Sequence, residues 1–212
     1  MFLIVAGGEP PGKELLQELA LKAGMVVAAD KGAQYCLAGG ITPGLVVGDM
    51  DSLGRESLDA LGALGVEMKR LSTDKDLTDT EAALDESMLR GARHVEILGA
   101  LGGRIDHTLA NIHLLRKALD HGVRARITSE TQEIFLVDSS ETIHGCRGRT
   151  VSFLPLTEKV EGVSLKGFRY ELEDAVMEIG RPYGISNVVT AEKGFIEVGR
   201  GVLLAVVSRG RV

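Results

Sequence analysis

Residues 45–52 read LVVGDMDS, a short apolar run that passes through one glycine into two aspartates. A continuous apolar run bounded by turn residues is typical of a strand buried on both faces of a parallel sheet. Asp49 and Asp51 alternate along an extended segment, so their side chains point the same way. Because ligands of open parallel sheets bind at the carboxyl ends of the strands, this carboxylate pair indicates a site at the end of the strand.

The alternation of apolar runs and amphipathic stretches continues on both sides of this strand. Further strands are expected at residues 2–6, 25–28, 67–71 and 94–98. Helices are expected at residues 13–23, 33–38, 55–64, 80–90 and 106–121. Strands that alternate with helices predict a mainly parallel sheet with helices on both faces. We therefore expect residues 1–122 to form a three-layer α/β/α domain of the Rossmann-like kind.

The pattern changes after Gly122, where no helix of convincing length is expected. Short strands separated by turn residues are expected at residues 123–129, 133–137, 150–154, 162–165, 173–179, 186–191, 194–198 and 202–207. Regularly spaced short strands are typical of a small antiparallel sandwich or barrel. Residues 123–212 are therefore predicted to form a C-terminal antiparallel β-sandwich, the second of two domains.

Composition narrows the class of protein. Of the 212 residues, 44% are hydrophobic, which is enough for a packed core without disulfides. Cys36 and Cys146 lie far apart without metal-ligand spacing, so we expect free thiols in a reducing compartment. The net charge of −6 argues against nucleic-acid or anionic-membrane partners. The apolar start at residues 1–6 is too short for a signal peptide or a membrane span, so a cytoplasmic protein is expected.

Ten of the twelve aspartates lie in the first domain, and several follow successive predicted strands. They are Asp30, then Asp49 and Asp51, then Asp74, Asp76 and Asp79, then Asp106. So many carboxylates at one edge repel one another unless a cation lies among them, and Mg²⁺ suits oxygen ligands and phosphate substrates. Helix capping offers a simpler role for Thr78, Glu81 and Asp106, but it does not explain Asp74, Asp76 and Asp79 together.

A glycine-rich turn precedes the last predicted helix of the first domain. Residues 99–107 read GALGGRIDH. The glycines allow a close backbone approach, and a helix start favours an anion. Arg104 could hold a phosphate through two parallel hydrogen bonds. His107 lies next to this site, where we expect it to be structural rather than a base.

Two further motifs point to other phosphate chemistry, and both are disfavoured. Residues 7–13 have the spacing of a P-loop. However, Glu14 replaces the Ser or Thr that binds Mg²⁺, and Pro10 and Pro11 lack backbone N–H donors. The Asp49–Asp51 pair is also similar to the start of haloacid-dehalogenase-type phosphatases, but in that family the motif usually follows the first strand.

Taken together, the motifs resemble the thiamine pyrophosphokinase family along almost the whole chain. In order they are ADKGA (29–33), GDMDS (48–52), KDLTDTE (75–81), GGRIDH (102–107) with Asn111, GFRYEL (167–172), ISN (185–187) and GVLL (201–204). Each is weak alone, but their order and spacing are specific. Lys31, Met50 and Gly184 depart from the Gly, Phe and Ser that are common in the family.

The resemblance implies an enzyme that transfers the pyrophosphoryl group of ATP to the hydroxyl of thiamine, giving thiamine diphosphate and AMP with Mg²⁺. It implies an N-terminal catalytic domain that binds ATP and Mg²⁺ and a C-terminal β-sandwich that binds thiamine. It also implies a homodimer in which each thiamine site is shared between the catalytic domain of one subunit and the sandwich of the other.

Roles follow from the resemblance for residues that match its motifs. Asp49, Asp51 and Asp79 are expected to bind Mg²⁺, with Asp30 beside them, and these four with Arg104 form the expected catalytic set. Lys75, Thr78, Arg104 and His107 are expected to bind ATP. Asp106, Tyr170, Ser186 and Asn187 are expected to bind thiamine. The base that accepts the thiamine hydroxyl proton is left open between Asp30 and Asp51.

Two alternatives remain beside this reading. The same fold could use another acceptor, for example a pterin alcohol, in which case the sandwich determines the substrate. The chain could also be a nucleotide or thiamine sensor without catalysis, although a sensor has no need of Asp49, Asp51, Asp79 and Arg104 together.

Overall fold

The computed structural model describes residues 1–72 and 76–209, which form two compact units, Met1–Glu130 and a second unit that begins at Thr131. The expected boundary after Gly122 lies just ahead of strand β6 (Arg124–Thr128). This strand pairs in parallel with β5 (His94–Leu98) and so belongs to the first unit. The strand expected at residues 123–129 is therefore parallel rather than antiparallel.

The first unit alternates strands and helices from its first residues onward, as the sequence predicts. Its remaining strands are β1 (Phe2–Val5), β2 (Met25–Ala29), β3 (Leu45–Gly48) and β4 (Glu67–Arg70). Its helices are α1 (Lys13–Lys22), α2 (Gly32–Ala38), α3 (Arg55–Ala63), α4 (Asp79–Leu89) and α5 (Ile105–Asp120).

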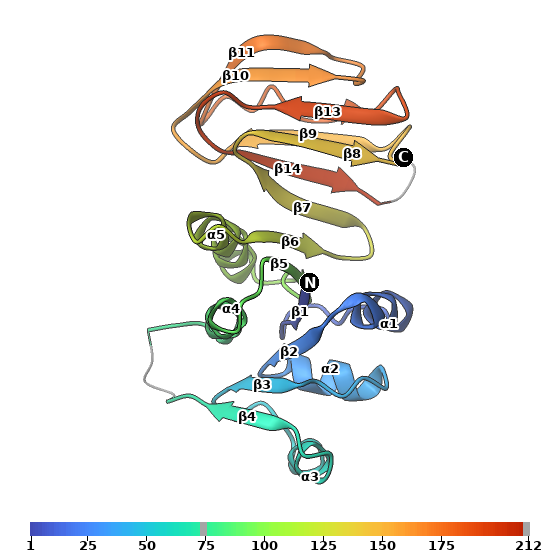
Figure 1. Ribbon diagram of the computed structural model, residues 1–212, viewed down its shortest axis with the longest axis vertical. Coiled ribbons are helices and arrows are strands. Elements are labelled where there is room, and N and C mark those ends of the chain that lie inside the picture. The colour runs from blue at the N-terminus through green and yellow to red at the C-terminus, as the bar shows by residue number, and fades with distance from the viewer. Residues whose placement is uncertain (73–75, 210–212) are drawn as a thin grey trace. The chain divides into compact units, whose positions relative to one another are not determined.

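The sheet of the first unit runs in the order β6-β5-β1-β2-β3-β4, and every pair in it is parallel. All four residues of β3 are buried, as expected for a strand covered on both faces. Helices α1 and α2 lie on one side of the sheet and α4 and α5 on the other (Figure 1). Side chains such as Leu3, Leu16 and Val46 are almost completely buried on the first of these sides. Each such side chain contributes about 1.5–3 kcal/mol when it leaves water.

The strand order reverses at β1. From there the chain moves outward through β2 and β3 to β4, and then returns to the other side of β1 as β5. The chain therefore continues from β1 to a neighbour on one side of it and from β5 to a neighbour on the other. Open α/β sheets bind ligands at such a point.

The second unit consists of strands only. They are β7 (Gln132–Val137), β8 (Ser140–His144), β9 (Thr150–Pro155), β10 (Lys159–Lys166), β11 (Leu172–Glu178), β12 (Asn187–Val188), β13 (Lys193–Glu197) and β14 (Leu203–Ser208). Strands β12-β9-β14-β7 lie in one antiparallel group and β11-β10-β13-β8 in another. Strand β8 was not among the strands predicted, because four of its five residues are polar.

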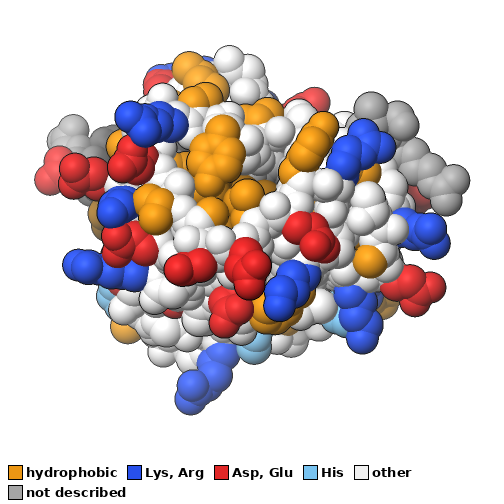
Figure 2. Space-filling view, turned by 90° about the horizontal axis from the view of Figure 1, so that it is seen from above, with side chains coloured by type: hydrophobic (Ala, Val, Ile, Leu, Met, Phe, Trp, Pro, Cys, Tyr) orange, Lys and Arg blue, Asp and Glu red, His pale blue; other side chains and the backbone are white. Residues whose placement is uncertain are grey.

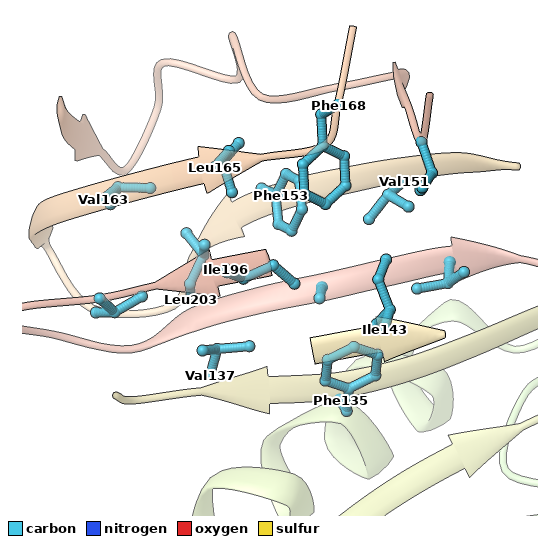
Figure 3. Packing of buried hydrophobic residues seen from close by; sticks show 14 of the residues in the cluster. Phe135, Val137, Ile143, Val151, Phe153, Val163, Leu165, Phe168, Ile196 and Leu203 are labelled. Atoms are coloured by element: carbon cyan, nitrogen blue, oxygen red, sulfur yellow. The ribbon is translucent and has the colours of Figure 1, made fainter. Parts of the chain in front are cut away.

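A single apolar core fills the space between these two groups of strands (Figure 3). Phe153 from β9 meets Phe168 edge to face, with ring centroids 5.4 Å apart and planes at 80°. Residues from both groups are packed there, Val163 and Leu165 from β10 and Leu203 from β14 among them. This packing is that of the β-sandwich predicted from the sequence.

Both cysteines are buried free thiols, as the sequence predicts. Burial in the core of the first unit raises the pKa of the Cys36 thiol to about 12. Among the described helices, none has the length and apolar character needed to cross a membrane.

Candidate active site

A cleft of about 810 Å³ opens at the carboxyl ends of the strands in the first unit. One wall is the loop after β1, residues 6–9, and another is the loop after β5, residues 100–104. The two loops are tied together, since Gly8 N donates to Gly99 O and Glu9 N donates to Leu101 O, each at 2.8 Å. The cleft therefore lies at the strand-order reversal, at the carboxyl ends of the strands.

Three carboxylates meet at this edge of the sheet. Asp30 follows β2 and lines the cleft, and its carboxylate lies within 4.8 Å of those of Asp49 and Asp51. Ser52 Oγ donates a hydrogen bond to Asp30 Oδ2. Asp30 Oδ1 is buried and accepts no hydrogen bond in the described residues. A buried carboxylate oxygen without a donor, beside two further carboxylates, fits a hard divalent cation such as Mg²⁺.

The backbone around this triplet is held in unusual conformations. Asp30 and Met50 have φ of 45° and 69°, in the left-handed region that non-glycine residues seldom adopt. Gly48 has φ of 155°, and a Cβ there would stand 2.9 Å from Asp30 Cβ. The end of β3 can approach Asp30 only because residue 48 has no side chain. Backbone strain of this kind is common at functional sites, where it fixes the direction of the side chains.

Interactions among the three carboxylates raise the pKa of Asp51. The pKa of Asp51 is raised by its hydrogen bond to Asp49 and by the negative charge of Asp49, with a smaller contribution from the charge of Asp30. Mutual repulsion of this kind favours a proton on one carboxyl group. A bound cation offsets the same repulsion, so the triplet favours cation binding over three free carboxylates.

Helix α4 presents its first turn to the cleft. Thr78 is the N-cap residue, and its Oγ1 accepts from Glu81 N at 3.1 Å, which is one of the two bonds of the predicted capping box. The Glu81 carboxylate binds Lys117. Thr78 and Asp79 line the cleft. Asp79 is not part of the Asp30 triplet, so its role in metal binding stays a prediction. Lys75, the expected ATP ligand before this helix, and Asp74 lie outside the described residues.

Helix α5 presents Arg104 and His107 to the same cleft. Arg104 binds Asp106 through two hydrogen bonds, Nε to Oδ1 at 3.2 Å and Nη2 to Oδ2 at 2.5 Å. The bond from Arg104 lowers the pKa of Asp106, and the pair raises that of Arg104. Asp106 lies in the first turn, while Arg104 occupies the N-cap position that the sequence suggested for Asp106.

The remaining predicted site residues belong to the second unit and lie beside one another. Asn187 is 5% exposed, and both ends of its amide bind the backbone of Tyr170. Ser186 has φ of 59°, and its N–H donates to Ser152 Oγ at 3.1 Å. Tyr170 is 64% exposed. The two sequence motifs at 167–172 and 185–187 thus form one hydrogen-bonded structure.

The cleft is also lined by residues that were not predicted as site residues. Ser52 and Lys31 line the cleft, and their only sequence signal was their place beside Asp51 and Asp30. Residues 7–9 also line it, although the P-loop reading of this segment is not supported. Gly12 N–H binds the Glu130 carboxylate at 3.0 Å, and Lys13 lies outside the cleft lining.

Comparison with known families agrees with the two units. Residues 16–127 match the family described as thiamin pyrophosphokinase, catalytic domain. Residues 135–203 match the family described as thiamin pyrophosphokinase, vitamin B1 binding domain. The first match contains the carboxylate triplet and the starts of α4 and α5 that line the cleft, and the second contains Tyr170, Ser186 and Asn187.

Whole-chain comparisons agree as well. The chain is 29% identical over 208 residues to the thiamine pyrophosphokinase of Bacillus subtilis (strain 168), covering 96% of both sequences. The crystal structure of the Bacillus subtilis thiamine pyrophosphokinase superposes with a TM-score of 0.87 at 28% identity, covering 99% of both chains. That of a thiamin pyrophosphokinase family protein from Enterococcus faecalis gives 0.84 at 29% identity, again covering 99% of both.

Proposed function

The chain belongs to the thiamin pyrophosphokinase family, and we propose that it transfers the pyrophosphoryl group of ATP to thiamine, giving thiamine diphosphate and AMP. The observation that carries this proposal is the carboxylate triplet with its buried, unpartnered Asp30 Oδ1 at the edge of the cleft. It supplies the ligands that an ATP-bound divalent cation needs, in the unit that matches the catalytic domain of the family.

Asp30, Asp49 and Asp51 would hold Mg²⁺ through carboxylate oxygens, with Asp79 as a further ligand from α4. When bound, Mg²⁺ supplies charge neutralisation to the phosphate oxygens that surround the reacting phosphorus. Ser52 fixes the Asp30 carboxylate through Oδ2, which leaves Oδ1 free for the cation.

The phosphates of ATP would lie against the first turns of α4 and α5. Helix N-termini offer unpaired backbone N–H groups and a favourable dipole to anions. Thr78, Arg104 and His107 line the cleft at these two helix starts and supply the side-chain donors, with Lys75 as a further expected ligand. Arg104 can bind phosphate with the guanidinium edge that Asp106 does not use.

The reaction would be a displacement at the β-phosphorus. The alcohol oxygen of thiamine forms a bond to that phosphorus while the bond to the oxygen of the AMP portion breaks, and AMP leaves with the electron pair. Asp30 and Asp51 are both candidates to accept the proton of the alcohol. Most of the rate enhancement would come from positioning and from neutralised charge.

Thiamine would be bound by Asp106 from the first unit and by Tyr170 and Ser186 from the second, with Asn187 beside them. A homodimer in the cytoplasm, with each thiamine site shared between subunits, is part of the proposal. Exposed apolar side chains in the second unit, Val176, Ile179, Tyr183 and Ile185, favour such an assembly. Figure 2 shows apolar groups gathered on the face above β10 and β11, with charged groups around them.

The test is incubation of the purified chain with ATP, Mg²⁺ and thiamine, followed by separation of the nucleotides. AMP should appear in step with thiamine diphosphate, and only when thiamine and Mg²⁺ are both present. Release of ADP or of inorganic phosphate instead would refute the proposal, and so would thiamine binding without turnover, which is the behaviour of a sensor. AMP release with a pterin alcohol but not with thiamine would point to a different acceptor.

A further inference from the structure

Lys31 is a cation of the cleft with no assigned role. It follows Asp30 directly, lines the cleft, and occupies the N-cap position of α2.

The Lys31 side chain is supported on two sides. A Cβ added at Gly7 would stand 3.2 Å from Lys31 Cβ, which shows how closely the loop after β1 packs on its stem. At the other end, Nζ lies 5.9 Å from the centre of the Tyr35 ring, within reach of a cation–π interaction. Tyr35 is itself held, because its hydroxyl donates to Gly8 O at 2.9 Å. The Lys31 side chain is thus held between the loop after β1 and the Tyr35 ring, at a position that lines the cleft.

The Lys31 ammonium group differs from the Arg104 guanidinium group of the cleft in its pairing with carboxylates. Arg104 already forms two hydrogen bonds with Asp106. In residues 1–72 and 76–209, no carboxylate forms an ion pair with Lys31, whose Nζ lies near the Tyr35 ring. A polyphosphate that enters the cleft therefore meets in Lys31 a positive charge that is not paired with any of the described acidic groups.

We infer that Lys31 binds the β- and γ-phosphate oxygens of the nucleoside triphosphate. The inference rests on the proposed function for the identity of the nucleotide. Asp30, a member of the carboxylate triplet that would hold the nucleotide-bound Mg²⁺, is the residue next to Lys31. The ammonium group adds a charge-assisted hydrogen bond to the same part of the substrate.

The test measures equilibrium binding of ATP with Mg²⁺, and of AMP, by calorimetry in the absence of thiamine. Lys31→Met should weaken ATP binding about tenfold, the effect of losing one charge-assisted bond, and leave AMP binding within twofold of the wild type. Lys31→Arg should retain most of the ATP affinity. Lys193→Met, an equal charge change on β13 of the second unit, should leave both affinities unchanged.

Each outcome bears on the inference. Unchanged ATP affinity in Lys31→Met overturns it, and so does an equal loss for ATP and AMP, which would indicate a general change of the cleft. A wild-type chain that binds no ATP overturns both the inference and the proposed function. If ATP binds and depends on Lys31 but thiamine elicits no AMP, the inference stands and only the proposed reaction fails.

Discussion

The side-chain amide of Asn187 forms hydrogen bonds with both the backbone N–H and the backbone carbonyl of Tyr170. Its Oδ1 accepts from Tyr170 N at 3.0 Å, and its Nδ2 donates to Tyr170 O at 2.7 Å. The same Oδ1 accepts from Val188 N at 2.9 Å. Oδ1 therefore accepts two bonds and Nδ2 donates one, all to protein backbone groups, while the Tyr170 side chain is exposed. The sequence suggested that Asn187 contacts thiamine directly. This geometry instead favours a role for Asn187 in positioning Tyr170.

A double-mutant cycle separates these two roles. Tyr170→Ala and Asn187→Ala should each raise the KM for thiamine about five- to tenfold, the scale of one aromatic contact. The double variant should be little worse than either single one, because Asn187 acts through Tyr170. Steady-state kinetics with a melting temperature for each variant provides the data. Single effects that multiply in the double variant would show that Asn187 contacts thiamine independently.

Asp49→Asn should lower turnover by about 100-fold or more with the fold intact, because the amide keeps the shape but not the charge that a divalent cation requires. The measurement is kcat at saturating ATP and thiamine over a range of Mg²⁺ concentrations. Asp59→Asn on α3 is the matched control, since Asp59 is exposed and forms a long surface ion pair with Arg55, at 4.0 Å. Turnover near the wild-type level in Asp49→Asn would exclude Asp49 as a metal ligand.

Gly48→Ala tests the close approach between β3 and Asp30. The added methyl group would lie 2.9 Å from Asp30 Cβ at a φ of 155°, so the free energy of unfolding should fall by about 1–3 kcal/mol. Mg²⁺-dependent activity should fall too, because the Asp30 carboxylate is displaced. Gly62→Ala on α3 is the control. Its methyl group would meet nothing within 4 Å, and alanine in a helix gains about 0.5–1 kcal/mol over glycine. Equal melting temperatures for the two variants would contradict the prediction.

The architecture follows from the sequence because its signals are local. Buried strands such as β3 are continuous apolar runs, and the Thr78 capping box marks the start of α4 in the chain itself. The carboxylates at strand ends could be placed at one edge because parallel strands end together. The family motifs then specified the chemistry.

What the sequence could not provide depends on contacts between distant segments. Whether the Asn187 amide faces a ligand or the Tyr170 backbone is decided by the pairing of loops 17 residues apart. Strand β6 is parallel because it pairs with β5. Its sequence could not predict this, since the alternation of apolar and polar residues is the same in a parallel and an antiparallel strand. Ser140–His144 buries only Ile143, which is too weak a pattern to predict β8. In the sequence Lys31 stands out only as a departure from the family motif, and its place in the cleft depends on the folded loops around it.

Helices α4 and α5 are joined by a charged cluster in which Lys117 binds both Glu81 and Asp85, with Nζ 2.9 Å from Glu81 Oε1 and 2.6 Å from Asp85 Oδ1. Burial by itself lowers the pKa of Lys117, but the hydrogen bonds and charges of Asp85 and Glu81 outweigh it and raise the pKa. Glu81 belongs to the capping box beside Asp79, so the cluster steadies the helix start that faces the cleft.

Lys117→Met should lower the free energy of unfolding by about 1–2 kcal/mol at pH 7, because it leaves two neighbouring carboxylates without their cation in a partly buried place. Because folding raises the pKa of Lys117, the stabilisation from its charge is fully present at neutral pH and is lost as the pH rises past the pKa of an ordinary lysine, about 10.4. The difference between variant and wild type should therefore shrink above about pH 10.5. Urea unfolding at pH 7 and at about pH 11 measures it, with Lys22→Met as the control, since Lys22 pairs with Glu18 on an exposed face. A loss of equal size at both pH values would show that the lysine stem, rather than its charge, holds the two helices together.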